Sequence, residues 1–396
     1  MSTARPLITV GQRRARLQRR HLLLGEPVGS VQDVVSSVVA LHATCPPTVY
    51  LSMWARRPGS SVADLDDALY RRRSLIRQLA MRRTMFVVDR ATLTDAVSCV
   101  GARVAASERT NILRDLRRDP TYPDPDGWLD AAATAVVTAL AAGLEGTSTQ
   151  LREAIVEIGG RVATGSDSSM PIGPRVLNML SAAGAIVRGT NTVGWHQFRP
   201  CWAAMDRWLP SPLQLRDPAT GHREMVRRWL QTFGPGTETD IVWWLGSTKT
   251  AVRAALAEVQ AVAVDVETGD ATTPVATGYL LPDDLDPVEP VPPRAVLLPE
   301  LDPATMGWKQ RDFYLAPHAG HLFDRNGNGG QTAWWDGRVV GGWYLRPGGG
   351  VALHLLEPLP AAAVAQLRSR AAQLDEWLGD IRPKPGYPAP FHATVS

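Results

Sequence analysis

Residues 223–259 read REMVRRWLQTFGPGTETDIVWWLGSTKTAVRAALAEV, and this stretch begins with two clearly punctuated helices. The first is predicted over 223–233, because its apolar residues recur at helical spacing and it stops at the Gly-Pro-Gly of residues 234–236. Thr237 suits the N-cap of a short second helix, and Gly246 suits its end. The stretch therefore predicts a compact helix pair joined by a tight turn.

A third helix and a hairpin follow directly. Ser247 is the predicted cap, and the helix after it has apolar residues at Val252, Leu256 and Val259. Strand-like segments follow at 261–266 and 277–281. Three helices and a two-stranded hairpin are typical of a winged-helix unit, in which the third helix enters a DNA groove and the hairpin touches the backbone.

The same order of elements occurs twice more. One copy has helices over 127–144, from Thr147 or Ser148, and over 174–184, followed by two strands within 185–198 around an Asn-Thr turn. The other copy has helices over 10–24, after Ser30, and over 61–72, followed by strands at 75–81 and 83–89. One such pattern is weak evidence because it is common, whereas three copies in one chain favour a tandem array.

From about Pro290 the sequence changes in character. The segments TAWWDG, RVVGGWYL and VALHLL within 332–356 alternate like antiparallel strands, with turns at Asp336-Gly337 and Pro347-Gly348. They predict a small β-barrel or sheet, closed by a helix over 360–378. The expected fold class is therefore α+β, with three tandem winged-helix units and a β-rich subdomain that together form a C shape around DNA. The predicted boundaries are 1–120, 121–212, 213–288 and 289–396.

Composition narrows the class of protein. No apolar run is long enough for a membrane span and no signal peptide is recognisable. The three cysteines, Cys45, Cys99 and Cys201, lie far apart, which favours a reducing compartment, so we expect a cytoplasmic protein. The net charge is only +3, but 39 of the 42 basic residues are arginine, and they cluster at 13–20 and 71–83. Such clusters are typical of a polyanion partner, although a GC-rich genome also favours arginine.

Four stretches resemble the AlkZ and YcaQ family of bacterial DNA glycosylases. They are VVALHATCPPTVYLSMWAR, RRTMFVV, TFGPGTETDIVWWLG, and VLLPELDPATMGWKQR with DGRVVGGWYL. The resemblance covers nearly the whole chain. It implies a horseshoe of winged helices around alkylated DNA and excision of the damaged base without a metal.

The chain departs from the family in its catalytic motif. Family members carry Gln-x-Gln or Gln-x-Asp, whereas this sequence has His42-Ala43-Thr44. The departure resembles divergent members linked to self-resistance against DNA-alkylating natural products. The resemblance makes His42 and Thr44 the candidate catalytic residues.

The chemistry of base excision is compatible with this pair. A purine alkylated at N7 or N3 is cationic and already a good leaving group, so the enzyme chiefly needs to place a water beneath the sugar and stabilise positive charge. Neutral imidazole positions or deprotonates water near neutral pH, and a threonine hydroxyl assists.

The spacing of the motif makes a prediction about the backbone. Residues i and i+2 point in different directions on a helix but share a face on an extended segment. Pro46 and Pro47 favour an extended Cys45 and a helix end nearby, at or just after Leu41. The alternative is that His42 merely caps the C-terminus of that helix.

Other residues are candidates for DNA contact or for cofactor binding. Arg77, Arg82 and Arg83 of the first hairpin, together with Lys309 and Arg311, are predicted to contact the DNA backbone, the alternative being solvated surface charge. His318 and His321 lack the carboxylates or cysteines of a metal site, and the glycine-rich 325–330 lacks the lysine of a P-loop. We therefore expect no metal and no cofactor, and most of the tryptophans are expected in the core.

The predicted function is that of a monofunctional DNA glycosylase. It would hydrolyse the N-glycosidic bond of alkylated purines in double-stranded DNA, above all bulky N7-alkylguanine, for DNA repair or self-resistance to a genotoxic natural product. We expect a monomer without membrane contact. No lysine lies near the motif in the sequence, so a lyase step is not expected. The alternatives are a non-catalytic winged-helix regulator, which would recognise an operator as a symmetric dimer, and a protein that only sequesters a drug or its adduct.

Overall fold

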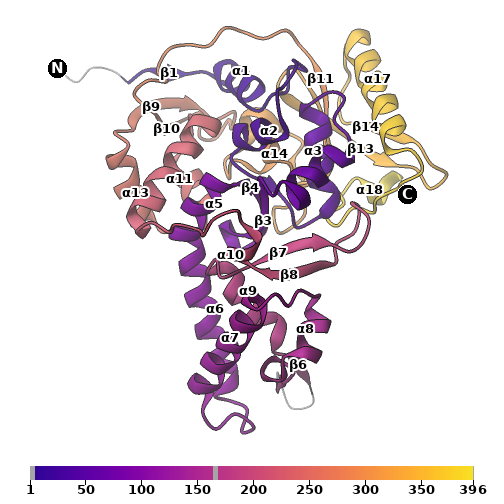
Figure 1. Ribbon diagram of the computed structural model, residues 1–396. Coiled ribbons are helices and arrows are strands. Elements are labelled where there is room, and N and C mark those ends of the chain that lie inside the picture. The colour runs from indigo at the N-terminus through magenta and orange to yellow at the C-terminus, as the bar shows by residue number, and fades with distance from the viewer. Residues whose placement is uncertain (1–4, 164–167, 396) are drawn as a thin grey trace. The chain divides into compact units, whose positions relative to one another are not determined.

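A computed structural model describes residues 5–163 and 168–395 of the chain. The fold is α+β, as predicted, and its contacts define two compact units (Figure 1). One unit comprises residues 66–222, and the other combines 1–65 with 223–396. The predicted first domain, 1–120, is thus divided between both units. No helix in the described part of the chain is long and apolar enough to cross a membrane.

The unit of residues 66–222 has a helical core. Its main elements are α6 (Ala102–Leu116), α7 (Pro125–Ala141) and α9 (Gly173–Ala182), and their facing apolar side chains form one buried cluster with α8 (Ser148–Ala154). Thr147 caps α8, and Gln150 completes a reciprocal capping box. The cluster also includes Val162 of β5 (Arg161–Ala163) and Ile186, Trp202 and Ala204 of a later hairpin, so it packs against these strands.

The second strand of one hairpin differs from the prediction. Strand β7 (Ile186–Asn191) pairs with β8 (Pro200–Ala204), so the expected strand within 193–198 is instead part of a long connection. The reason lies in Asn191, whose side chain accepts the Arg199 N–H at 2.8 Å and donates to the Val193 and Gln197 carbonyls. These bonds give the loop its own order and outcompete a tight Asn-Thr turn.

The other hairpin forms where the sequence predicts it. Strands β3 (Leu75–Leu79) and β4 (Met85–Asp89) are antiparallel, with Leu79 opposite Met85. The helix predicted over 61–72 is split into α4 (Val62–Asp66) and a π-helical turn (Asp67–Arg71). Helix α5 (Arg90–Ala96), a second π turn and α6 lie between the first and second predicted copies.

The second unit contains the helices and the hairpin predicted from residue 223 to residue 281. Helix α11 (Pro218–Phe233) is followed by α12 (Glu238–Leu245), α13 (Lys249–Glu258) and the hairpin β9 (Val262–Glu267) and β10 (Val275–Leu280). Thr237 and Asp240 form a capping box, and Gly246 is left-handed with φ 62°. The cap of the third helix is Thr248, one residue later than predicted. Strand β1 (Leu7–Ile8) adds to β9 in parallel.

Helices at the N-terminus complete this unit. They are α1 (Val10–Arg20), α2 (Val31–Ser37) and α3 (Pro46–Arg56). Helix α3 is not among the predicted elements, because Pro46 and Pro47 mark a break. In the structure they occupy the first two positions of a helix, where proline lacks no needed N–H.

The C-terminal strands form an open sheet, so of the two predicted alternatives the sheet is confirmed and the barrel is not. The order is β11 (Ala295–Leu298), β12 (Thr332–Trp335), β13 (Arg338–Leu345) and β14 (Val351–Leu355), all antiparallel. Within the described residues β11 and β14 do not pair, and four strands are too few to close a barrel. Helix α17 (Ala361–Leu378) packs on this sheet instead (Figure 1).

Short helices link the first two strands of the sheet. They are α14 (Pro303–Met306), α15 (Asp312–Leu315) and α16 (Ala319–Leu322). A chain of aromatic contacts joins them to α11: Trp229 stacks on Phe233, Phe233 meets Trp308 edge-on, and Trp308 does the same to Phe313. Trp244 and Trp334 are also buried, as expected for core tryptophans, while Trp243 and Trp335 are half-buried.

We predict that Gly236→Ala destabilises the protein. A Cβ at residue 236 would collide with the indole of Trp229, which is completely buried. Overpacking of this kind costs about 1–3 kcal/mol. The midpoint of urea unfolding, followed by tryptophan fluorescence, should fall. Gly320→Ala is the matched control, because a Cβ there meets nothing within 4 Å, and equal midpoints for both variants would contradict the prediction.

Candidate active site

The backbone around His42 is extended, as predicted. Helix α2 ends at Ser37, four residues earlier than expected, and Val39 follows with a left-handed φ of 62°. Such a φ is a true outlier for a β-branched residue, and it turns the chain into the short strand β2 (Leu41–His42). Cys45 is extended, with φ −96° and ψ 118°, before α3 begins. His42 therefore does not cap a helix C-terminus.

The two motif side chains lie in different environments. His42 is 5% exposed, whereas Thr44 is exposed to solvent. The Thr44 backbone N–H points at His42 Nδ1 over 3.5 Å, the outer limit of a hydrogen bond. This contact favours the tautomer in which Nδ1 accepts and Nε2 carries the proton.

A buried carboxylate lies directly behind the motif. Glu300 accepts hydrogen bonds from the backbone N–H groups of Gly386, at 3.0 Å, and Tyr387. Its own carbonyl accepts the Thr48 hydroxyl at 3.0 Å. Burial raises the pKa of Glu300. Burial and the nearby Glu300 carboxylate raise the pKa of the Cys45 thiol, so Cys45 is a packing residue and no nucleophile at neutral pH.

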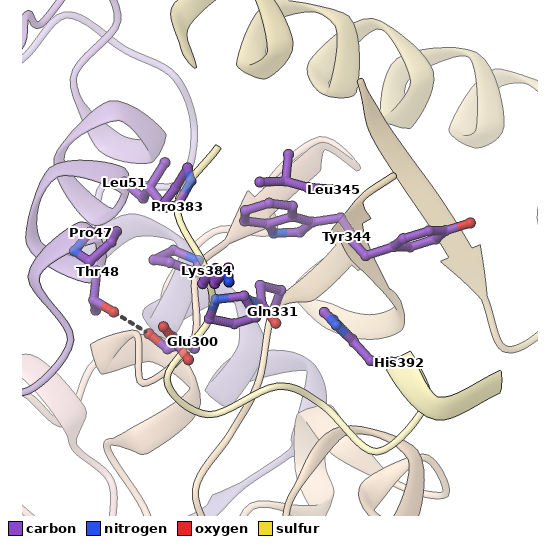
Figure 2. Close-up of a pocket in the computed structure, with 13 residues that line it drawn as sticks. Pro47, Thr48, Leu51, Glu300, Gln331, Tyr344, Leu345, Pro383, Lys384 and His392 are labelled. Atoms are coloured by element: carbon purple, nitrogen blue, oxygen red, sulfur yellow. Dashed lines mark hydrogen bonds between the residues drawn. The ribbon is translucent and has the colours of Figure 1, made fainter. Parts of the chain in front are cut away.

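Thr48 and Glu300 border a pocket at the N-terminus of α3 (Figure 2), whereas His42 and Thr44 do not belong to its lining. Residues of α3, of β13 and of the C-terminal segment line it, including Thr48, Glu300, Gln331, Trp343, Lys384 and His392. The Gln331 amide oxygen is buried and has no hydrogen-bond partner within the described residues. Lys384, which lies far from the motif in the sequence, also lines the pocket.

A buried ion pair fixes α3 against the segment that carries Glu300. Arg56 donates to both carboxylate oxygens of Asp302 at 2.7 Å, and the Ser52 hydroxyl donates to the same carboxylate at 2.6 Å. Both charged side chains are 0% exposed. Burial alone would raise the pKa of Asp302, but the Arg56 guanidinium outweighs it and holds that pKa below its ordinary value.

Asp240 positions the loop that carries the predicted DNA contacts Lys309 and Arg311. Its buried carboxylate accepts the backbone N–H groups of Lys309, at 2.9 Å, and Gln310, at 2.8 Å. The Lys309 side chain is exposed. The guanidinium of Arg311 lies 4.4 Å from the ring of Phe323 and 5.2 Å from that of Trp243. Both predicted residues of this loop therefore stand on a rigid support.

The predicted arginines of the first hairpin lie in the other unit. Arg82 and Arg83 occupy the turn between β3 and β4 with φ 53° and 59°. Two left-handed non-glycine residues in succession are strained, and such strain is concentrated at functional sites. Arg83 is exposed and pairs with Glu108. Arg77 is 4% exposed and lies over the ring of Phe198, so it is no ordinary surface charge.

The two histidines excluded as metal ligands have a different arrangement. His318 is buried and bonds Glu357 at 2.9 Å, whereas His321 is exposed. Hydrogen bonds from Arg338 and His318 lower the pKa of Glu357 to about 2. Within the described residues no group of three potential metal ligands is found.

The sequence of the chain matches the family model "DNA glycosylase AlkZ-like" over residues 35–377, so the chain belongs to the AlkZ-like DNA glycosylase family. Among solved structures, the DNA glycosylase AlkZ of Streptomyces sahachiroi has a similar fold. The TM-score is 0.72, over 97% of this chain and 99% of that chain, with 18% sequence identity. No curated protein matches the sequence at a significant level.

Sequence reasoning missed several residues of this site. Glu300 and Asp302 lie in VLLPELDP, where two acidic residues beside a buried apolar strand are a local signal of partnered carboxylates. Gln331 and Lys384 have no such local signal. They reach the pocket only through the sheet and the C-terminal segment.

We predict that breaking the buried pair strongly destabilises the protein. Arg56→Met leaves Asp302 buried and uncompensated, which costs about 3–5 kcal/mol. The double variant Arg56→Met, Asp302→Leu removes both charges and should recover much of that loss. Urea unfolding measures both effects, and a double variant no more stable than the single one would refute the explanation.

The same pair predicts a dependence of stability on pH. Because the pKa of Asp302 is lowered in the folded state, its contribution is present above the unfolded value of about 3.9 and is lost as pH falls through the folded value. The free energy of unfolding of the wild type should therefore drop more between pH 5 and pH 3 than that of the double variant. Parallel curves would argue against this role.

Proposed function

We propose that this protein is a DNA glycosylase that hydrolyses the bond between deoxyribose and an alkylated purine, chiefly a bulky N7-alkylguanine. The observation that carries the proposal is the extended segment of His42 and Thr44. This segment lies within the residues that the family model matches and shortly before Thr48, which lines the pocket. The role is repair of alkylated DNA, including self-resistance to a genotoxic natural product.

The proposed chemistry needs little from the protein. The alkylated purine leaves as a neutral base once the C1′–N9 bond breaks, and the sugar becomes an oxocarbenium-like cation. Water attacks C1′ and then loses a proton. When Nδ1 of His42 accepts from the Thr44 N–H, its Nε2 carries a proton and orients this water by donating to it. In the other tautomer, Nε2 accepts the proton that the water loses. The exposed Thr44 hydroxyl holds the same water or a phosphate oxygen.

Basic side chains, two of them exposed and two half-buried, supply the proposed DNA contacts. In one unit these are Lys309 and Arg311, on the loop that Asp240 holds. In the other they are Arg82 and Arg83, on the strained turn of the first hairpin. Phosphate contacts of this type position a protein on DNA without reading sequence, which suits an enzyme that searches for lesions. The protein is proposed to act as a monomer, and its cytoplasmic location stays a prediction.

The proposed reaction ends with base release. A lysine becomes a Schiff-base nucleophile when it is desolvated or lies beside another cation, whereas the Lys384 side chain is exposed. Lys384 lines the adjoining pocket although it lies far from the motif in the sequence, so sequence distance does not exclude a lyase step. The exposure of the Lys384 side chain is the stronger reason to expect none.

We therefore predict that borohydride traps no covalent complex between the protein and a duplex that contains an abasic site. The readout is a shifted band on a denaturing gel. If a trapped complex forms, Lys384→Arg identifies its source: loss of the band would replace the monofunctional proposal by one with a lyase step.

We predict that the variant His42→Ala, Thr44→Ala loses at least 100-fold in the single-turnover rate of base release from a duplex with N7-alkylguanine, because positioned acid–base groups contribute about 10²–10⁴-fold. Released base is measured by chromatography. His222→Ala is the control: this residue bonds its own helix at Pro218 and lies outside the motif. A fully active double variant would remove His42 and Thr44 from the mechanism.

A wild type that releases no base would overturn the glycosylase proposal itself. Gel shifts on random and alkylated duplexes then separate the alternatives. A regulator binds a defined operator and ignores lesions, whereas a sequestering protein retains the adduct or the free drug without cleavage.

A further inference from the structure

Two arginines of the unit 66–222 lie together without a counter-ion. Arg77 on β3 and Arg188 on β7 both pack near the ring of Phe198, with guanidinium carbons 4.3 Å and 6.0 Å from its centroid. Arg188 also lies 4.9 Å from the centroid of Trp202. Within the described residues neither guanidinium forms an ion pair with a carboxylate.

Arg77 keeps unused hydrogen-bond donors in the interior. Its side chain is 4% exposed, and its Nε and Nη1 are buried with no partner in the described part of the chain. Unpaired buried donors on a charged group are costly and call for an explanation. Burial, and then the charge of Arg77, lowers the pKa of Arg188 to about 10, which places the two cations close enough to repel each other.

Arg188 lies at the edge of this cluster, and a hydrogen bond fixes the orientation of its guanidinium. Its Nη2 donates to the Asn178 side-chain oxygen of α9 at 2.8 Å, a neutral partner that orients the guanidinium without cancelling its charge. Phe198 belongs to the loop that Asn191 orders, is half-buried, and lines an open groove together with Arg199. The cluster thus adjoins solvent.

We propose that Arg77 and Arg188 form a binding site for one phosphate of the DNA backbone, with the ring of Phe198 fixing both guanidiniums. The inference rests on the proposed function for the identity of the anion as DNA. Two arginine forks supply charge-assisted donors that match phosphate oxygens, and an anion between them satisfies the donors and relieves the repulsion. Cation–π contact holds each fork without a competing carboxylate.

The test is the salt dependence of binding to an unmodified duplex. Each phosphate contact adds about 0.9 to the slope of log K against log salt concentration. We expect Arg188→Gln to lower the slope by about that amount, and the double variant with Arg77→Gln to lower it no further, since both residues hold one phosphate. Arg109→Gln is the matched control, with the same change of charge at an exposed residue that pairs with Asp130 at 2.8 Å; its slope should equal that of the wild type.

A second measurement tests the site even if one of the variants folds poorly. Inorganic sulfate should raise the melting temperature of the wild type and of Arg109→Gln more than that of Arg188→Gln, because a bound anion stabilises the folded state by mass action. Without sulfate, Arg188→Gln should be at least as stable as the wild type, as it removes a like-charge repulsion. If neither the slope nor the sulfate effect changes in Arg188→Gln, the anion site is overturned. If only the sulfate effect changes, the site binds small anions and its assignment to a DNA phosphate is overturned.

The outcomes separate this site from the proposed function. Base release with unaltered slopes would leave the glycosylase intact and reject the phosphate site. Altered slopes without base release by the wild type would keep the phosphate site and reject the glycosylase.

Discussion

The bidentate bond between Arg56 and Asp302 is the constraint on which the candidate site depends. It joins α3, which begins two residues after the motif, to the segment from β11 to α14, which carries Glu300. Both charges are removed from water, so the geometry is tolerated only because Ser52 and the Ala304 N–H satisfy the remaining carboxylate lone pairs. A slide of α3 along β11 would break all of these bonds together. The pair thus fixes the register between two segments nearly 250 positions apart in the chain.

Strain in the backbone is concentrated beside this joint. Val39 precedes the motif with φ 62°, and Leu301, between Glu300 and Asp302, has φ 56°. Both are buried side chains for which a left-handed conformation is unfavourable. The Leu301 N–H is nevertheless satisfied by the Gly329 carbonyl at 2.9 Å. Burial of the side chains offsets the strain, and the result is that His42 and Glu300 stand on segments too short and irregular to shift independently.

Local chemistry explains which parts of the fold are predictable from sequence. Thr237 and Thr147 cap helices as predicted, because a capping box is set by residues three apart. The extended segment at His42 follows in the same way from Pro46 and Pro47. By contrast, the position of β8 depends on the side chain of Asn191, and helix α3 depends on prolines that read equally well as a break. The pocket residues Gln331 and Lys384 meet only through long-range pairing, which no local pattern encodes. The division into winged-helix units remains an interpretation of the element order.

Under the proposed mechanism, His42 and Thr44 can stand in place of a glutamine motif because the proposed reaction depends on position more than on acid strength. A cationic purine needs no proton to leave, so the protein's task is to hold a water against a nascent cation. In the proposed mechanism this water is held by His42, whose imidazole is 5% exposed. The extended backbone keeps Thr44, two residues further on, at the solvent boundary. The strained turn at Val39 and the buried ion pair of α3 therefore have the same effect: they hold the short segment of His42 in place.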